Sequence, residues 1–160
     1  MMTDINLKGP RKARRNGFSL IELLIVVAII LIIAAIAIPN FLHARMAANE
    51  STAVSSIHAI NTSEIAYSSA NPTIGCSATL ADLGPAVSGY LDSVLSSGAK
   101  SGYIFTYVQD TSSVPSVGYT LNADPTTRGV TGQRSFYSNQ LNITHYNLSA
   151  VSTATDPIIQ

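Results

Sequence analysis

The chain has 160 residues, of which 46% are hydrophobic and only 11% are charged, and its formal net charge is zero. It contains nine Lys and Arg residues in all and a single cysteine, Cys76. One cysteine excludes an intrachain disulfide, and so few basic residues give little support to a nucleic-acid-binding surface.

Charge is distributed unevenly along the chain. Residues 1–17 hold five basic side chains and one acidic side chain, a balance of +4, whereas the remaining residues hold four basic and eight acidic side chains, a balance of −4. Positive charge beside a membrane span favours the cytoplasmic side. We therefore expect residues 1–17 to be a cytoplasmic basic leader and the residues after Ile38 to be translocated.

The next segment, from Phe18 to Ile38, is apolar except for Ser19 and Glu22. Its length matches the roughly 20 residues that a helix needs to cross about 30 Å of hydrocarbon, so the segment predicts a transmembrane helix. An acidic residue inside such a helix costs about 2.5 to 3.5 kcal/mol even on the lenient insertion scales. Glu22 is therefore expected to have a partner.

The motif Gly17-Phe18-Ser19-Leu20-Ile21-Glu22, followed by this long apolar segment, resembles the N-terminus of type IV pilins and type II secretion pseudopilins. The resemblance covers residues 14 to 42 and includes Pro39, which matches the proline in the middle of the family's long helix. It implies that a prepilin peptidase cuts after Gly17 and methylates Phe18. It further implies a structural subunit without cofactor or enzymatic activity, whose partners are identical subunits and the inner-membrane assembly machinery of a pilus or secretion system.

The residues themselves suggest a role for Glu22. Cleavage after Gly17 would create a cationic amine on Phe18, which needs an anion nearby in apolar surroundings. In a filament like those of the family, the amine of one subunit would meet Glu22 of a neighbour and fix the axial register. The alternative is an acid in the first helical turn that the helix dipole favours by about 0.3 to 1 kcal/mol, with no role in assembly.

Other interpretations of the N-terminus remain open. Ala35-Ile36-Ala37 supplies a cleavage site for an ordinary secretory signal peptide, although the apolar region of such a peptide runs about 7 to 15 residues and is shorter than this one. An uncleaved signal anchor would leave Gly17-Phe18 and Glu22 unexplained. The N-terminus could also serve only to export or anchor a ligand-binding module.

The helix is expected to continue beyond the membrane to about Ala70, where Asn71-Pro72 ends it. Pro39 removes one helical hydrogen bond, so a kink is predicted near Asn40, unless Pro39 merely ends the membrane span. One face carries apolar residues at helical spacing: Leu42, Met46, Ala53, Ile57, Ile60 and Tyr67. The opposite face carries Ser51, Ser55, His58 and Thr62.

Shorter elements are predicted in the second half of the chain. One or two short helices are expected between Thr73 and Lys100, around Leu80, Leu83, Tyr90, Leu91, Val94 and Leu95. From Ser101 the hydrophobic period changes to two, which predicts four strands, at residues 103–108, 118–123, 134–137 and 142–146. Short connections favour an antiparallel meander. The expected fold class is α+β: a long N-terminal helix packed on a four-stranded antiparallel sheet, the pilin fold.

This pattern predicts three parts: a leader at residues 1–17, a transmembrane and assembly helix at 18–39, and a periplasmic or extracellular globular domain at 40–160 that includes the amphipathic half of the helix. Cys76 is expected to be a small buried residue, and the C-terminal part to be held by packing and backbone pairing without a disulfide.

No catalytic or metal-binding pattern is apparent. The three histidines, His43, His58 and His145, are far apart in the sequence, and the first two are expected on the helix surface. Asp124 with nearby carbonyls could bind calcium, as loop carboxylates do in some pseudopilins, but the pattern is much weaker than a calcium loop.

The sequence predicts a structural subunit of a type IV pilus, with a type II secretion pseudopilin as the alternative. The subunit would span the inner membrane of a bacterium with its N-terminus inside, in contact with lipid, before assembly into an extracellular pilus or a periplasmic pseudopilus. Whether it serves motility, adhesion, DNA uptake or secretion, and whether it is a major or minor subunit, is left open.

Overall fold

The computed structural model describes residues 17–159; of the expected leader, residues 1–16 lie outside the described residues. The chain divides into two compact units on either side of the bond between Ile38 and Pro39. The first unit contributes the N-terminal part of a long helix. The second unit contains the rest of that helix and all strands.

Helix α1 runs over Leu20–Ala70, a length of 51 residues. It begins directly after Ser19, whose carbonyl accepts hydrogen bonds from the backbone N–H groups of Glu22 and Leu23 at 3.1 and 3.2 Å. It ends just before Asn71-Pro72, as predicted. Pro39 lies inside α1, so the helix does not end there. The predicted kink stays a prediction.

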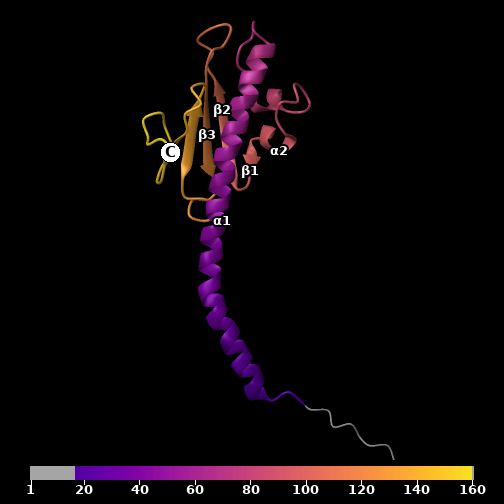
Figure 1. The fold of residues 1–160 in the computed structure, drawn as a ribbon, viewed down its shortest axis with the longest axis vertical. Helices are drawn as coiled ribbons and strands as arrows, with labels where there is room; N and C mark the ends of the chain where they lie inside the picture. Colours follow the sequence, from indigo (N-terminus) through magenta and orange to yellow (C-terminus); the bar gives the residue numbers. More distant parts are fainter. Residues whose placement is uncertain (1–16, 160) are drawn as a thin grey trace, which may run out of the picture. The chain divides into compact units, whose positions relative to one another are not determined.

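The strands of the second unit form one antiparallel sheet in the order β1-β2-β3-β4-β5. Figure 1 shows the sheet beside the C-terminal half of α1. This confirms the α+β class and the meander. The strands are β1 (Ala99–Lys100), β2 (Tyr103–Gln109), β3 (Tyr119–Pro125), β4 (Ser135–Asn139) and β5 (His145–Asn147).

The sheet has five strands, so the expected number of four is wrong. All four predicted strands are present, but β1 was missed because two residues cannot show an alternating pattern. A tight turn at Ser101 and Gly102, with φ of 51° and 74°, folds β1 back onto β2. The last strand is also shorter than predicted. It starts at His145, and Asn142 has a positive φ of 58°, which an extended strand does not allow.

The core lies between α1 and one face of the sheet. From α1, Ala53, Ile57 and Ile60 are at most 1% exposed, which confirms the centre of the predicted stripe. At its ends Tyr67 is partly buried and Leu42 is exposed. The predicted polar face is exposed throughout: Ser51, Ser55, His58 and Thr62. The buried side chains of the sheet are Tyr103, Phe105, Tyr119, Leu121, Ala123 and Phe136.

Two short helical segments connect α1 to the sheet, as predicted: the 3-10 helix η1 (Leu80–Leu83) and α2 (Ser93–Ser96). The Asp92 carboxylate caps α2 by accepting the backbone N–H groups of Val94 and Leu95, each at 2.9 Å. Four leucines of this region join the core, whereas Tyr90 and Val94 are exposed. The buried leucines are Leu80, Leu83, Leu91 and Leu95.

The C-terminal residues run back alongside β5. The N–H of Tyr146 donates to the carbonyl of Pro157, and the N–H of Ile159 donates to that of Thr144, both at 2.9 Å. Cys76 is a free, buried thiol. The C-terminal part is thus held by backbone pairing and packing, as the sequence predicted.

Candidate functional site

The first unit exposes an apolar helical surface. An 18-residue stretch of α1 has a mean hydropathy of 3.3, and none of it is buried. Length and composition make α1 the one helix of the described residues that could cross a membrane. Burial of one large aliphatic side chain stabilises by about 1.5 to 3 kcal/mol, so a surface of this extent requires lipid or other protein around it.

The predicted processing residues lie immediately before this surface. Gly17, Phe18 and Ser19 precede the first residue of α1 and have no regular secondary structure. Phe18 is 78% exposed. A non-helical, exposed backbone is the form in which a peptide bond is open to a protease.

Glu22 lies in the first turn of α1 and is exposed. Ser19 and Glu22 have the spacing of a capping box, in which each side chain bonds the backbone of the other. Neither side chain makes a hydrogen bond or ion pair within residues 17–159. The carboxylate is therefore free, among the described residues, to meet a cation supplied by another molecule.

Five polar residues of α1 are buried in the second unit, which the sequence analysis did not anticipate: the small Ser56 and Ser63, and the larger Glu50, Asn61 and Glu64. Glu50 is 7% exposed, and Asn61 and Glu64 are each 1% exposed. Glu50, Asn61 and Glu64 each lie three or four residues along the helix from apolar residues of the stripe, so the helical periodicity was a signal for their burial. It was overlooked because Glu and Asn are mostly surface residues.

Glu50 joins α1 to the start of β4. Its carboxylate accepts the backbone N–H groups of Gln133 and Arg134 at 2.8 and 3.1 Å and the guanidinium Nε of Arg134 at 2.7 Å. Burial alone raises the pKa of Glu50, but these three donors outweigh it and hold the pKa below its ordinary value. The carboxylate therefore stays ionised and keeps its partners.

Asn61 joins α1 to the other end of the sheet. Its amide oxygen accepts the Tyr119 hydroxyl at 2.8 Å, and its amide nitrogen donates to Ser138 Oγ at 3.0 Å and to Asn142 Oδ1 at 2.7 Å. Glu64 accepts the N–H of Ser77 at 3.0 Å and the hydroxyl of the same residue. These polar contacts fix the position of the sheet along the helix, since buried groups left unpaired would be costly.

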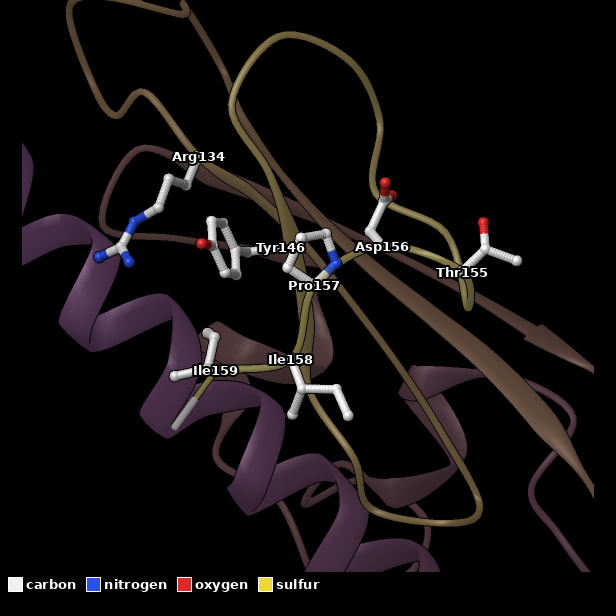
Figure 2. A pocket seen from close by; sticks show the side chains of 7 residues that line it. All are labelled: Arg134, Tyr146, Thr155, Asp156, Pro157, Ile158 and Ile159. Atoms are coloured by element: carbon white, nitrogen blue, oxygen red, sulfur yellow. The ribbon is translucent and has the colours of Figure 1, made fainter.

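A groove of about 800 Å³ lies at the C-terminal segment, and we call it the C-terminal groove. Figure 2 shows Tyr146 between the guanidinium of Arg134 and the ring of Pro157, with Ile158 and Ile159 close by. The guanidinium carbon lies 5.8 Å from the centre of the Tyr146 ring. Within residues 17–159, neither the terminal guanidinium nitrogens nor the Tyr146 hydroxyl has a hydrogen-bond partner. The lining residues are Arg134, Tyr146, Thr155, Asp156, Pro157, Ile158 and Ile159.

The remaining candidate residues are scattered. His43 and His58 are exposed on α1, as expected, and Nδ1 of His145 lies 2.6 Å from the carbonyl oxygen of Asp156. Asp124 belongs to β3, and its Oδ1 is buried without a hydrogen-bond partner. Residues 17–159 contain no group of three or more His, Cys, Asp or Glu side chains that could hold a metal ion.

Comparison with known proteins identifies the N-terminal segment. Residues 12–38 match the family model described as the prokaryotic N-terminal methylation motif. The chain is 48% identical over 54 residues to the type IV major pilin protein PilA of Myxococcus xanthus, a match covering 34% of this chain and 24% of that protein. It is 66% identical over 35 residues to the type IV wide pilus major component PilA4 of Thermus thermophilus, covering 22% and 27%.

These matches span only about a quarter of the length of each relative. No solved structure matches the chain. Residues 12–38 thus match the methylation motif, and part of the chain is similar to two type IV pilus components, which confirms the resemblance inferred from the sequence. Both relatives are pilus components by name, in agreement with the expectation that the chain is not an enzyme.

Proposed function

We propose that this chain, which carries the prokaryotic N-terminal methylation motif, is a structural subunit of a type IV pilus. It is made as a prepilin in the inner membrane, cleaved after Gly17 by a prepilin peptidase and methylated on Phe18. It then polymerises through the N-terminal part of α1 into a helical filament of identical subunits. Its role is structural, and lipid surrounds the apolar helix before assembly.

The observation that carries this proposal is the unpaired Glu22 on an otherwise apolar, fully exposed helical surface. Lipid satisfies the apolar side chains of a single subunit but not the carboxylate. A neighbouring copy satisfies both, because its own helix covers the apolar surface and its Phe18 amine neutralises Glu22. An anchor for an unrelated binding module would need no carboxylate at this position.

Substitution of Glu22 tests the assembly role. We expect Glu22→Gln and Glu22→Val to leave export and membrane insertion unchanged and to abolish sheared surface filaments, because the Phe18 amine then has no carboxylate to meet. The measurement is the amount of subunit in the sheared fraction compared with the membrane fraction. Ser19→Ala, which removes the other polar side chain of the segment, is the matched control and should assemble. Filaments at the wild-type level from both Glu22 variants would refute the role.

The N-terminus of the recovered protein tests the processing. Intact mass and N-terminal sequencing should find a chain that begins with methylated Phe18 in the sheared fraction. The same N-terminus found only in membranes would favour a pseudopilin or a minor subunit. A chain that begins at Ile38 would indicate an ordinary signal peptide and would overturn the proposal.

A further inference from the structure

Arg45 is the first charged residue of α1 after the apolar span, and its side chain is exposed. It follows Ile38, the last residue of the predicted span, by seven residues, which is about 10 Å along a helix. It makes no hydrogen bond or ion pair within residues 17–159. The guanidinium is therefore free, among the described residues, just beyond the predicted end of the span.

The other lysine and arginine side chains of residues 17–159 are already engaged. Lys100 and Arg134 each pair with a carboxylate, at 3.2 and 2.7 Å. The Arg128 guanidinium donates to backbone carbonyls and to a serine hydroxyl. Arg45 is thus the one basic side chain of this part of the chain that has an anion still to bind.

The loop between β3 and β4, residues 126–134, lies beside the same part of α1. The Asn49 side-chain amide donates to the carbonyl of Thr131 in this loop at 2.8 Å. Arg45 is four residues before Asn49, so the two side chains lie on the same side of α1, with Arg45 one turn nearer the membrane span. Arg45 and the β3–β4 loop therefore belong to one surface.

The β3–β4 loop is fixed in shape and presents an apolar side chain, Val130, which is 60% exposed. The N–H groups of Val130 and Thr131 both donate to the carbonyl of Thr127, at 3.1 and 2.9 Å. The Thr126 N–H donates to the carbonyl of Gly102 at 2.9 Å, which joins the loop to the turn between β1 and β2. A loop that is already ordered loses little entropy when it binds.

The acidic side chains near this end of the sheet do not oppose an anion at Arg45. Glu50 and Asp92 are each neutralised by a basic partner. Asp124 lies on the face of the sheet away from α1, because its neighbour Ala123 is buried in the core. Asp156 lies at the β5 side and accepts hydrogen bonds from nearby groups of the chain.

A layer of lipid headgroups matches this surface in position and in chemistry. Headgroups occupy roughly 5 to 8 Å on each side of the hydrocarbon core, and arginine side chains near the end of a span extend toward that layer. Lipid phosphate is the anion that the planar guanidinium of Arg45 binds best, with two parallel hydrogen bonds. Val130 is a side chain that can enter the apolar boundary beneath the headgroups.

We propose that the surface made of Arg45 and the β3–β4 loop rests on the lipid headgroups on the translocated side of the membrane before assembly. The Arg45 guanidinium binds a lipid phosphate, and Val130 packs among the headgroups. The contact gives every waiting subunit the same orientation toward the membrane. This inference rests on the membrane-inserted stage of the proposed function.

Quenching by labelled lipid tests the contact. The full chain with Val130→Cys carries an environment-sensitive fluorophore and is placed at low density in vesicles of phosphatidylcholine and phosphatidylglycerol. The headgroups of both leaflets carry a spin label, so either orientation of the chain is detected. We expect strong quenching at position 130. The native thiol of Cys76 is buried, and the unsubstituted chain is the control for its labelling.

A label at Val114→Cys is the matched control. Val114 is also exposed, and it lies in the loop that follows the end of the sheet where Gln109 pairs with Tyr119. The β3–β4 loop lies at the other end, beyond Pro125, and the seven residues of β2 separate the two ends by about 20 Å. A label at position 114 should therefore be quenched little.

Arg45 variants in the Val130→Cys background test the ionic part. One basic residue near an anionic membrane surface contributes about a fivefold factor to binding. The ratio of quenched to unquenched label should therefore fall about fivefold in Arg45→Gln and recover in Arg45→Lys. The difference between Arg45→Gln and the parent should shrink in 1 M salt. Neither substitution removes a contact within residues 17–159, so the fold is preserved.

The outcomes separate this inference from the proposed function. An inserted chain whose label at position 130 is quenched no more than that at position 114 would overturn the contact and leave the pilus subunit standing. Unchanged quenching in Arg45→Gln would overturn it as well, since the tether of α1 alone would then bring the loop near lipid. If that variant also lost its sheared filaments, Arg45 would belong to a contact between subunits. A chain that does not insert at all contradicts the proposed function itself.

Discussion

Individual polar side chains decide how the helix meets the sheet. Glu50 is a buried carboxylate that gains three donors from the two residues before β4. Because these donors hold its pKa below the ordinary value, the folded chain binds a proton there less readily than the unfolded chain. Glu50 therefore stabilises the fold above its ordinary pKa near 4.5, and that stabilisation is lost as the pH falls below it.

Because the pKa of Glu50 is lowered in the folded chain, removal of its charge should reduce stability in a pH-dependent way. Glu50→Gln should lower the free energy of unfolding at pH 7 by about 1 to 3 kcal/mol, since the ion pair and one strong acceptor are lost. The deficit relative to wild type should shrink toward pH 3, because the unfolded chain then takes up a proton at Glu50 more readily than the folded chain does. Thermal unfolding followed by circular dichroism at both pH values measures it. A deficit that stays constant with pH would show that charge is not the cause.

The thiol of Cys76, the chain's single cysteine, should react slowly in the folded protein. Burial raises the pKa of Cys76, and the nearby Glu64 carboxylate raises it further, so little thiolate forms at neutral pH. We expect Cys76 to react with a maleimide on the order of 100-fold more slowly in the native protein than in denaturant. A cysteine introduced at the exposed Val114 is the reference. Equal rates at the two positions would show that Cys76 is accessible.

Among the elements, the loop after β5 is held by one arginine that follows β3, in addition to the backbone pairing of the last residues alongside β5. The Arg128 guanidinium donates to Ser135 Oγ at 2.7 Å and to the carbonyls of Leu148 and Ala150 at 3.1 Å each, and it also donates to the carbonyl of Gln133. These bonds hold the loop after β5 against the sheet. A single side chain thus supports a segment whose own secondary structure is sparse.

Removal of this arginine should loosen the loop selectively. We expect Arg128→Ala to cost about 1 to 3 kcal/mol of stability and to expose the segment around Leu148 and Val151 to thermolysin. The cleavage site can be mapped by mass spectrometry. Arg45→Ala, on the exposed face of α1, removes the same side chain without these contacts and serves as the control. Unchanged digestion of Arg128→Ala would contradict the proposed support.

The sequence predicted the elements where the signal was local. Asn71-Pro72 predicted the end of α1, and the alternation of hydrophobic and polar residues predicted four strands. Both signals are local, because the geometry of proline and the two-residue period of a strand act within a few residues. Glu50 and Asn61 follow the spacing of the apolar stripe, but the partners that satisfy their buried side chains lie about 80 residues away and cannot be inferred from the local pattern. The C-terminal groove was missed for the same reason, as it exists only after β4, β5 and the last residues come together.

For the whole molecule, the second unit contains the core and nearly all the polar contacts described above. A chain that begins at Pro39 should therefore fold as a soluble monomer with a single cooperative unfolding transition, and it should form no filament. Sedimentation and circular dichroism of this fragment measure both properties. The full mature chain, with its exposed apolar helix, should need detergent. A fragment that unfolds without cooperativity would show that residues before Pro39 are needed for the core.

The two outer strands of the sheet bear on how subunits avoid unwanted association. At one side β1 is only two residues long and carries Lys100, which pairs with Asp92 at 3.2 Å. At the other side Pro157, which has no N–H, runs alongside β5. Neither side offers a long row of free backbone donors and acceptors to an incoming strand. In the proposed pilus, subunits held close together in a membrane before assembly would thus be protected from amyloid-like strand addition, and ordered growth would be left to the helices.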